Sequence, residues 1–76
     1  MTYSIISRGE MLINYSNQTV KTSIRVSGEL VFNSPIFYAD LFIFKKRSVL
    51  SENINQKIID FIMHDSINKG TKIIFD

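Results

Sequence analysis

The sequence predicts a single α+β domain over residues 1–76: an antiparallel sheet of about five strands, one α-helix packed on one face, and a C-terminal strand after the helix. Three observations predict it. Residues 1–45 are rich in strand-forming residues, residues 51–69 have the periodicity of an amphipathic helix, and residues 71–75 again favour a strand. A chain of this length buries about 60% of its unfolded surface, so we expect one small core.

The first half of the chain predicts three strands. Residues 3–8 and 10–15 form the first two, and Gly9 between them indicates a bend, a bulge or a tight turn. Residues 19–26 alternate most clearly between apolar and polar positions. The same phase continues past Gly28, so this segment is either one long strand with a kink or two strands with a break. The side chains expected to point inward are Ile5, Met11, Ile13, Tyr15, Val20, Thr22, Ile24 and Val26.

The next strand is predicted from Ile36 to Phe44, after a turn that Pro35 marks by its fixed φ. Apart from Asp40, both faces of this segment are apolar, which is typical of a strand in the middle of a sheet. One helix covers only one face of a sheet. We therefore expect either a sheet that curls enough to bury both sets of side chains, or a second copy or another protein on the open face.

The helix is predicted over residues 51–69 because both of its ends carry recognisable signals. Ser51 is the expected N-cap, and Lys69 followed by Gly70 indicates a last turn with a left-handed stop. Its apolar face is expected to pack on the sheet. That face comprises Ile54, Ile58, Phe61 and Ile62, with Ile59 at its border.

Composition narrows the class of protein. The net charge of +2 comes from one run, Lys45-Lys46-Arg47, without which the balance would be slightly negative. Because basic residues form no stripe across the sequence, nucleic acid is an unlikely partner. The absence of cysteine excludes a disulfide framework and favours the cytosol. The N-terminal segment lacks the basic region and the long apolar region of a signal peptide, and no apolar run approaches the length of a membrane span. We expect a soluble, cytoplasmic protein.

The sequence offers little catalytic chemistry. His64 is the only histidine and follows Asp60 by four residues, a spacing at which a carboxylate can orient an imidazole. No glycine-framed nucleophile accompanies the pair, so we interpret it as a surface ion pair with Lys57 alongside. Without cysteine or a cluster of ligands, no metal or cofactor is expected. The prediction is a protein that is not an enzyme.

Three short segments carry a family resemblance, in this order along the chain: Val26-Ser27-Gly28-Glu29-Leu30; Phe42-Ile43-Phe44-Lys45 leading to Ser48-Val49; and Ser51-Glu52 continuing through residues 57–62 to Lys69-Gly70 and the last strand. Over residues 19–76 the chain resembles a small immunity protein family of bacterial polymorphic toxin systems, which include contact-dependent growth inhibition. The resemblance implies a cytosolic protein that binds and neutralises one cognate toxin domain, often a nuclease.

One helix leaves large apolar side chains of the aromatic strand uncovered. We therefore predict that this strand and its basic end form the toxin-binding site. The candidate residues are Tyr38, Asp40, Phe42, Phe44, Lys46 and Arg47. The alternative is a small non-catalytic binding module that forms a homodimer through the open sheet face, with or without RNA as a ligand. Aromatic side chains beside basic ones can stack single-stranded bases, but core packing explains these phenylalanines more simply.

Overall fold

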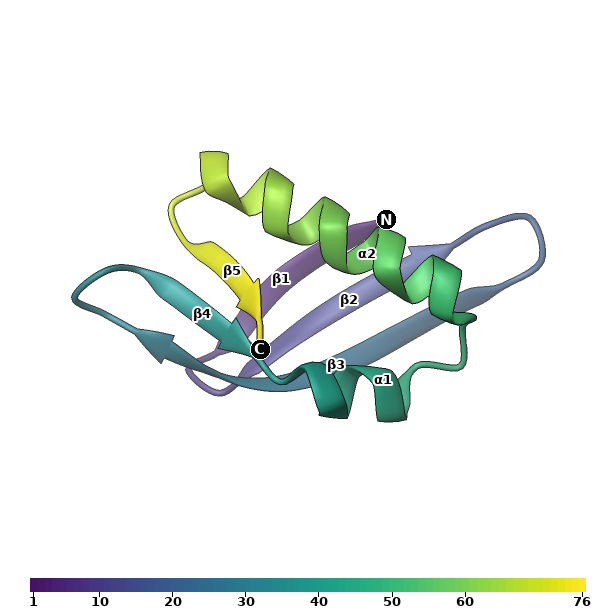
Figure 1. The fold of residues 1–76 in the computed structure, drawn as a ribbon, viewed down its shortest axis with the longest axis horizontal. Coiled ribbons are helices and arrows are strands. Elements are labelled where there is room, and N and C mark those ends of the chain that lie inside the picture. Colours follow the sequence, from purple (N-terminus) through teal and green to yellow (C-terminus); the bar gives the residue numbers. More distant parts are fainter.

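A computed structural model describes residues 1–76 and confirms a small α+β domain (Figure 1). In chain order the elements are β1 (Thr2–Ser7), β2 (Glu10–Ser16), β3 (Lys21–Val31), β4 (Ile36–Ala39), α1 (Leu41–Arg47), α2 (Glu52–Asp65), the 3-10 helix η1 (Ser66–Asn68) and β5 (Lys72–Phe75). Neither α-helix combines the length and the apolar character that crossing a membrane requires.

The five strands form one curled sheet in the order β1-β2-β3-β4-β5. The pairs β1–β2, β2–β3 and β3–β4 are antiparallel, whereas β5 runs parallel to β4. The prediction of a fully antiparallel sheet is therefore wrong for its last strand. The reason lies in the connection: α1 and α2 lead the chain back to the end of the sheet where β4 began, and a strand that starts there must be parallel.

β3 joins the two halves of the sheet and is one continuous strand of 11 residues. Its first part pairs with β2, and the part from Gly28 to Val31 pairs with β4. Of the two sequence-based alternatives, the long strand is the one that forms. A Cβ atom at Gly28 would lie 2.5 Å from both the Phe37 ring and the carbonyl oxygen of Tyr38, so glycine lets β4 approach closely at this position.

The predicted strand from Ile36 to Phe44 is wrong beyond Ala39, where α1 begins. Asp40 caps this helix: its Oδ1 accepts a hydrogen bond of 3.0 Å from the N–H of Ile43. A run that is apolar in both phases has no strand period of its own, and Leu41 and Phe44 also share one face of a helix. The domain consequently has two α-helices instead of the single one expected.

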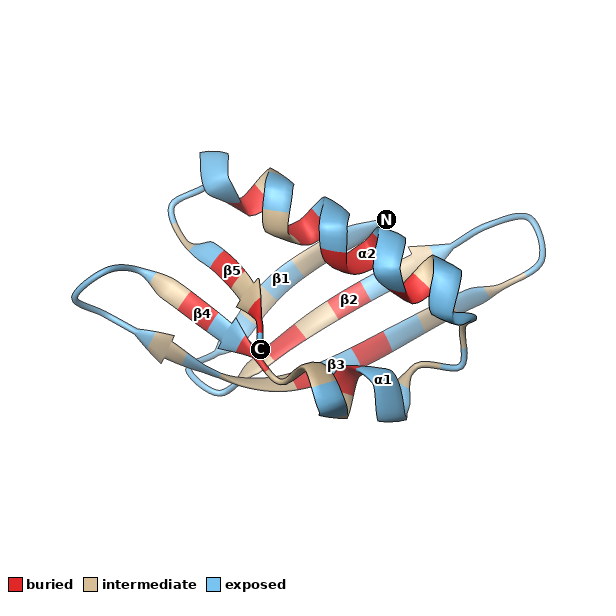
Figure 2. Cartoon of the chain, viewed as in Figure 1, coloured by how far each residue is buried: buried red, intermediate tan, exposed pale blue.

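Both helices lie on one face of the sheet, which we call the inner face, and the core lies between these two layers (Figure 2). The buried apolar residues are Met11, Ile13, Ile24, Val26, Phe37, Ala39, Phe44, Ile58, Ile59, Ile62, Ile73 and Phe75. One predicted core position on α2 is wrong: Phe61 is 49% exposed. Asn55 is buried on this helix instead, and its Oδ1 accepts a hydrogen bond of 2.6 Å from the Ser48 hydroxyl.

The two ends of α2 differ in how well the sequence predicted them. Ser51 is the N-cap as expected, with its Oγ accepting a hydrogen bond from the N–H of Ile54. The α-helix ends at Asp65 and not at Lys69, and Gly70 does not adopt a left-handed conformation. The buried Ser66 explains the early end, because its hydroxyl accepts the N–H of Ile73 and so ties η1 to β5.

Candidate protein-binding surface

The solvent-facing side of α1 and the loop after it combine exposed apolar and basic side chains. We call this set the α1 surface; it comprises Phe42, Lys45, Lys46 and Val49. Phe42 is 71% exposed and Val49 is 78% exposed, more than any other large apolar side chain of the protein. Phe42, Lys45 and Lys46 share one helix face because they are three and four residues apart. Exposed apolar groups framed by charge are typical of a protein interface.

The α1 surface sits on a rigid support, because both ends of the short helix are fixed. Asp40 caps its N-terminus, and Phe44 is fully buried on its opposite side, where its ring packs edge-on against that of Phe75 at 5.4 Å between centroids. At its C-terminus, Arg47 Nη1 donates a 3.0 Å hydrogen bond to the carbonyl oxygen of Arg25 in β3. Phe42 is therefore presented on a helix that cannot easily turn.

The charge on this surface is only partly neutralised. Lys45 lies 3.7 Å from the Glu52 carboxylate, an exposed pair of small energetic value. Lys46 takes part in no salt bridge, since the only other ion pair of the protein joins Arg25 and Glu10. The α1 surface consequently presents net positive charge beside Phe42, which favours an acidic partner surface.

The structure separates the six residues predicted as one binding strand. Phe42, Lys46 and Arg47 all lie on α1, and Asp40 is its N-cap. Tyr38 lies on the outer face of the sheet, because its neighbours Phe37 and Ala39 point into the core. The prediction of Phe44 as a binding residue is wrong, because its side chain is fully buried and cannot contact a partner of the folded protein. Val49 was missed because an isolated valine in a loop gives no sequence signal.

A second apolar area lies on the outer face, and we call it the outer patch: Val31, Ile36, Tyr38 and Ile74. Register places Val31 opposite Ile36, and Tyr38 opposite Ile74. All four are partly or largely accessible, and Glu29 and Lys72 flank them in the same registers. This is the sheet face that the sequence left in need of a cover, and within the chain both helices lie on the other side.

The predicted ion pair around His64 does not form. Asp60 Oδ1 instead accepts a 2.9 Å hydrogen bond from Gln56 Nε2, one turn earlier on α2. His64 is exposed, and neither it nor Lys57 takes part in a salt bridge. No three His, Asp or Glu side chains gather in a way that could hold a metal ion.

Sequence reasoning also missed a bond between the first strand and the end of α2. The Tyr3 hydroxyl donates to Asp65 Oδ2 at 2.5 Å. Burial, the hydrogen bond to Asp65 and the negative charge of that carboxylate together raise the pKa of Tyr3 from 10.0 to about 12. A contact between residues so far apart in the chain leaves no local pattern by which it could have been found.

Comparison with protein-family models, with curated proteins and with solved structures finds no match to this chain. Its function is therefore inferred from its own residues and their arrangement.

Proposed function

We propose that this chain is an immunity protein that binds and neutralises a cognate toxin domain through the α1 surface, in the cytosol and without chemistry of its own. The observation that carries the proposal is the position of Phe42: a large aromatic side chain, 71% exposed, on a helix whose other side is anchored in the core. Aromatic side chains on rigid supports are common energetic centres of protein interfaces.

The positive charge of α1 favours a particular kind of toxin as the partner. Lys45, Lys46 and Arg47 form the most basic segment of the chain, and they adjoin Phe42 on α1. Metal-dependent nucleases gather carboxylates to hold their cations, so a basic surface with an aromatic anchor is complementary to such an active site. The proposed toxin is therefore a nuclease whose active-site rim is acidic, in keeping with the family resemblance of residues 19–76.

The test begins with the partner. A tagged copy of the chain is expressed at natural level in its own host, captured, and the eluate is weighed by intact mass spectrometry. We expect one protein in a fixed ratio, whose toxicity on expression is abolished by this chain. Recovery of the bare chain, or a captured protein that is not toxic, contradicts the proposal.

The interface is then tested with matched variants. Phe42→Ala is expected to weaken toxin binding by about 2 kcal/mol or more, the range of an interface hot spot. The control is Phe32→Ala, because Phe32 is also highly exposed but lies against the Arg8 guanidinium, away from α1. Equal affinities for the two variants would remove the α1 surface from the proposal.

The outer patch favours a second candidate, a non-catalytic module that forms a homodimer through this face. Val31, Ile36, Tyr38 and Ile74 offer a self-complementary apolar area with a carboxylate and an ammonium group at its border. Sedimentation equilibrium distinguishes the candidates: Tyr38→Glu should convert a dimer to a monomer if this face is the interface, and an unchanged monomer at high concentration contradicts the second candidate.

A further inference from the structure

The two outer strands of the sheet differ in how their free edges are treated. β1 and β5 are the edge strands, because the strand order ends at each of them. On β5 the N–H of Ile73 points away from β4 but is not free: it donates to the buried Ser66 hydroxyl at 2.9 Å. β5 also has only four residues and includes a lysine, two features that protect an edge.

The edge of β1 has less protection. β1 has six residues, Thr2–Ser7, with neither a charged residue nor a proline among them. One irregularity in register, between Ile5 and Ser7, lies at its far end and leaves the first residues regular. Proteins commonly guard an exposed edge with lysine, proline or a covering loop, and an unguarded edge can pair with another strand.

Along a strand, successive residues direct their backbone N–H and C=O groups to opposite sides. This alternation identifies the free backbone groups on the edge of β1. The N–H of Asn17 donates to the carbonyl of Val20, so the odd-numbered residues of β2 direct their backbone groups to β3. The even-numbered residues of β2 then direct their backbone groups to β1, where Leu12 is opposite Ser4. It follows that Tyr3 and Ile5 direct their N–H and C=O groups away from the sheet.

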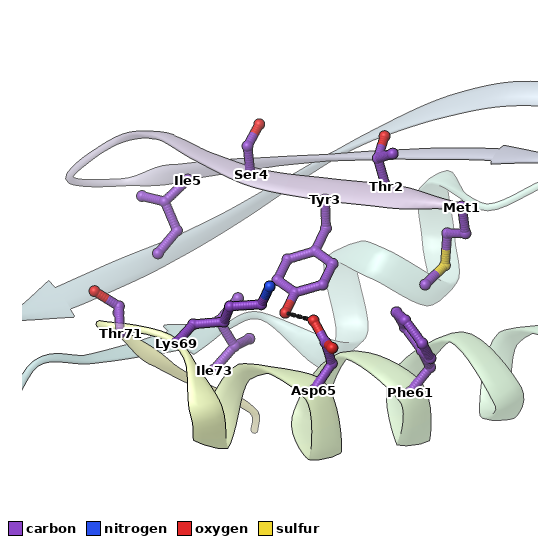
Figure 3. A pocket seen from close by; sticks show the side chains of 10 residues that line it. All are labelled: Met1, Thr2, Tyr3, Ser4, Ile5, Phe61, Asp65, Lys69, Thr71 and Ile73. Atoms are coloured by element: carbon purple, nitrogen blue, oxygen red, sulfur yellow. Dashed lines mark hydrogen bonds between the residues drawn. The ribbon is translucent and has the colours of Figure 1, made fainter.

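The same strand borders a cleft of about 420 Å³ between β1, the end of α2 and the start of β5 (Figure 3). Residues 1–5 line it without interruption, as expected where a cleft runs along the edge of a strand. Phe61, which is 49% exposed, supplies the accessible apolar wall, whereas Ile73 also lines the cleft but is buried. The Tyr3 side chain crosses to α2 and bonds Asp65, so the separation between the strand and the helix is fixed.

The cleft also contains a cation without a partner. Lys69 lines it, is exposed, and takes part in no salt bridge. In Figure 3 its side chain extends toward the Tyr3 hydroxyl. Asp65, the one carboxylate that lines the cleft, already accepts the Tyr3 hydroxyl. The features that a ligand can use here are therefore the free main-chain groups of β1, an apolar wall and the Lys69 ammonium group.

We propose that the free edge of β1 binds an extended segment of a partner protein, which adds to the sheet as a sixth strand, places an apolar side chain against Phe61, and directs an acidic side chain to Lys69. Strand addition of this kind takes affinity from main-chain hydrogen bonds and specificity from the side-chain pockets. The site lies on β1, α2, β5 and the connection that precedes β5, and it includes no residue of the α1 surface, so it goes beyond the proposed function.

The probe is a display library of nine-residue peptides, selected on the immobilised full-length chain. We expect enriched peptides to alternate β-branched with polar residues and to carry one Asp or Glu. Addition of such a peptide should slow amide hydrogen exchange at Tyr3 and Ile5 at least tenfold, as followed by NMR. The amide of Ser4, which already faces β2, should change little.

Two variants test the contacts. Lys69→Glu should weaken peptide binding at least tenfold, whereas Lys72→Glu, an exposed lysine that does not line the cleft, should not. A chemically synthesised chain N-methylated at Ile5 keeps its side chain and its β1–β2 bonds but should lose the peptide. Phe42→Ala should bind peptides normally, so this result is separate from that of the α1 surface.

Three results would overturn the proposal. They are a library that yields no enrichment above background, peptides whose binding survives N-methylation of Ile5, and protection of Tyr3 and Ile5 that depends on protein concentration alone. The last of these would assign the edge to pairing between two copies of this chain.

Discussion

The Tyr3 hydroxyl and the Asp65 carboxylate are 62 positions apart in sequence and share a hydrogen bond of 2.5 Å. This bond joins the first strand to the end of α2, which η1 in turn ties to β5 through Ser66. The Tyr3 ring also meets that of Phe61 edge-on, at 6.4 Å between centroids. The two edges of the curled sheet are therefore held by the same end of one helix.

Removal of the Tyr3 hydroxyl should destabilise the fold. Tyr3→Phe keeps the ring but deletes the bond to Asp65, and we expect the free energy of unfolding at pH 7 to fall by roughly 1–2 kcal/mol. Urea unfolding followed by circular dichroism measures it. The control is Tyr15→Phe, because the Tyr15 hydroxyl only accepts an exposed bond from Asn17. Equal losses for the two variants would contradict a special role for the Tyr3 bond.

The same tyrosine should make stability depend on alkaline pH. The folded-state pKa of Tyr3, about 12, exceeds the ordinary value of 10.0, so the folded state favours the protonated phenol. This stabilisation is complete below pH 10 and is lost as pH rises toward 12. The difference in free energy of unfolding between the natural chain and Tyr3→Phe should shrink over that interval. A difference that stays constant from pH 8 to 12 would contradict the raised pKa.

Gly28 should tolerate no side chain. The methyl group of Gly28→Ala would meet the Phe37 ring and a backbone oxygen of β4 at 2.5 Å, and we expect a loss of about 1–3 kcal/mol or more in free energy of unfolding. Gly70→Ala is the matched control, since nothing lies within 4 Å of its Cβ position and its φ is negative. That change should be neutral or stabilise by about 0.5 kcal/mol. Thermal unfolding of both variants measures these changes in stability.

The two phenylalanines of α1 should behave as opposites. Phe44→Ala removes a fully buried ring and should cost about 3–5 kcal/mol, enough to unfold much of a domain of this size. Phe42→Ala changes an exposed side chain and should alter stability by less than about 0.5 kcal/mol. Chemical denaturation of each variant measures the difference. Similar losses would mean that Phe42 also packs in the core.

The buried Ser66 hydroxyl should be needed at the closed edge of the sheet. Ser66→Ala leaves the N–H of Ile73 buried without an acceptor, which should cost about 1–3 kcal/mol. Ser34→Ala, at an exposed turn position, should change stability by less than about 0.5 kcal/mol. Amide exchange at Ile73 should also accelerate in Ser66→Ala alone. An unchanged exchange rate at the Ile73 amide would show that another group accepts its hydrogen bond.

The candidate site illustrates what a local pattern can miss. The sequence drew attention to Phe42 and to the basic run after it, and both lie on α1. It also grouped Tyr38 and Phe44 with them on one strand, whereas one lies on the outer face and the other in the core. An apolar run without a polar phase fits strand and helix equally, and in the structure the helix begins with the N-cap bond from Ile43 to Asp40 and is held by the packing of Phe44 on Phe75.

By itself the sequence determined the α+β class, the alternation that sets the inward faces of β2 and β3, the turn at Pro35 and the N-cap of α2, because each depends on residues close together in the chain. The tertiary structure alone decided the parallel β5, the end of α2 at Asp65 and the cleft beside β1. These features depend on contacts such as Ser66 with Ile73 and Tyr3 with Asp65. Local periodicity encodes which side of an element is buried, but it carries no information about which distant element covers it.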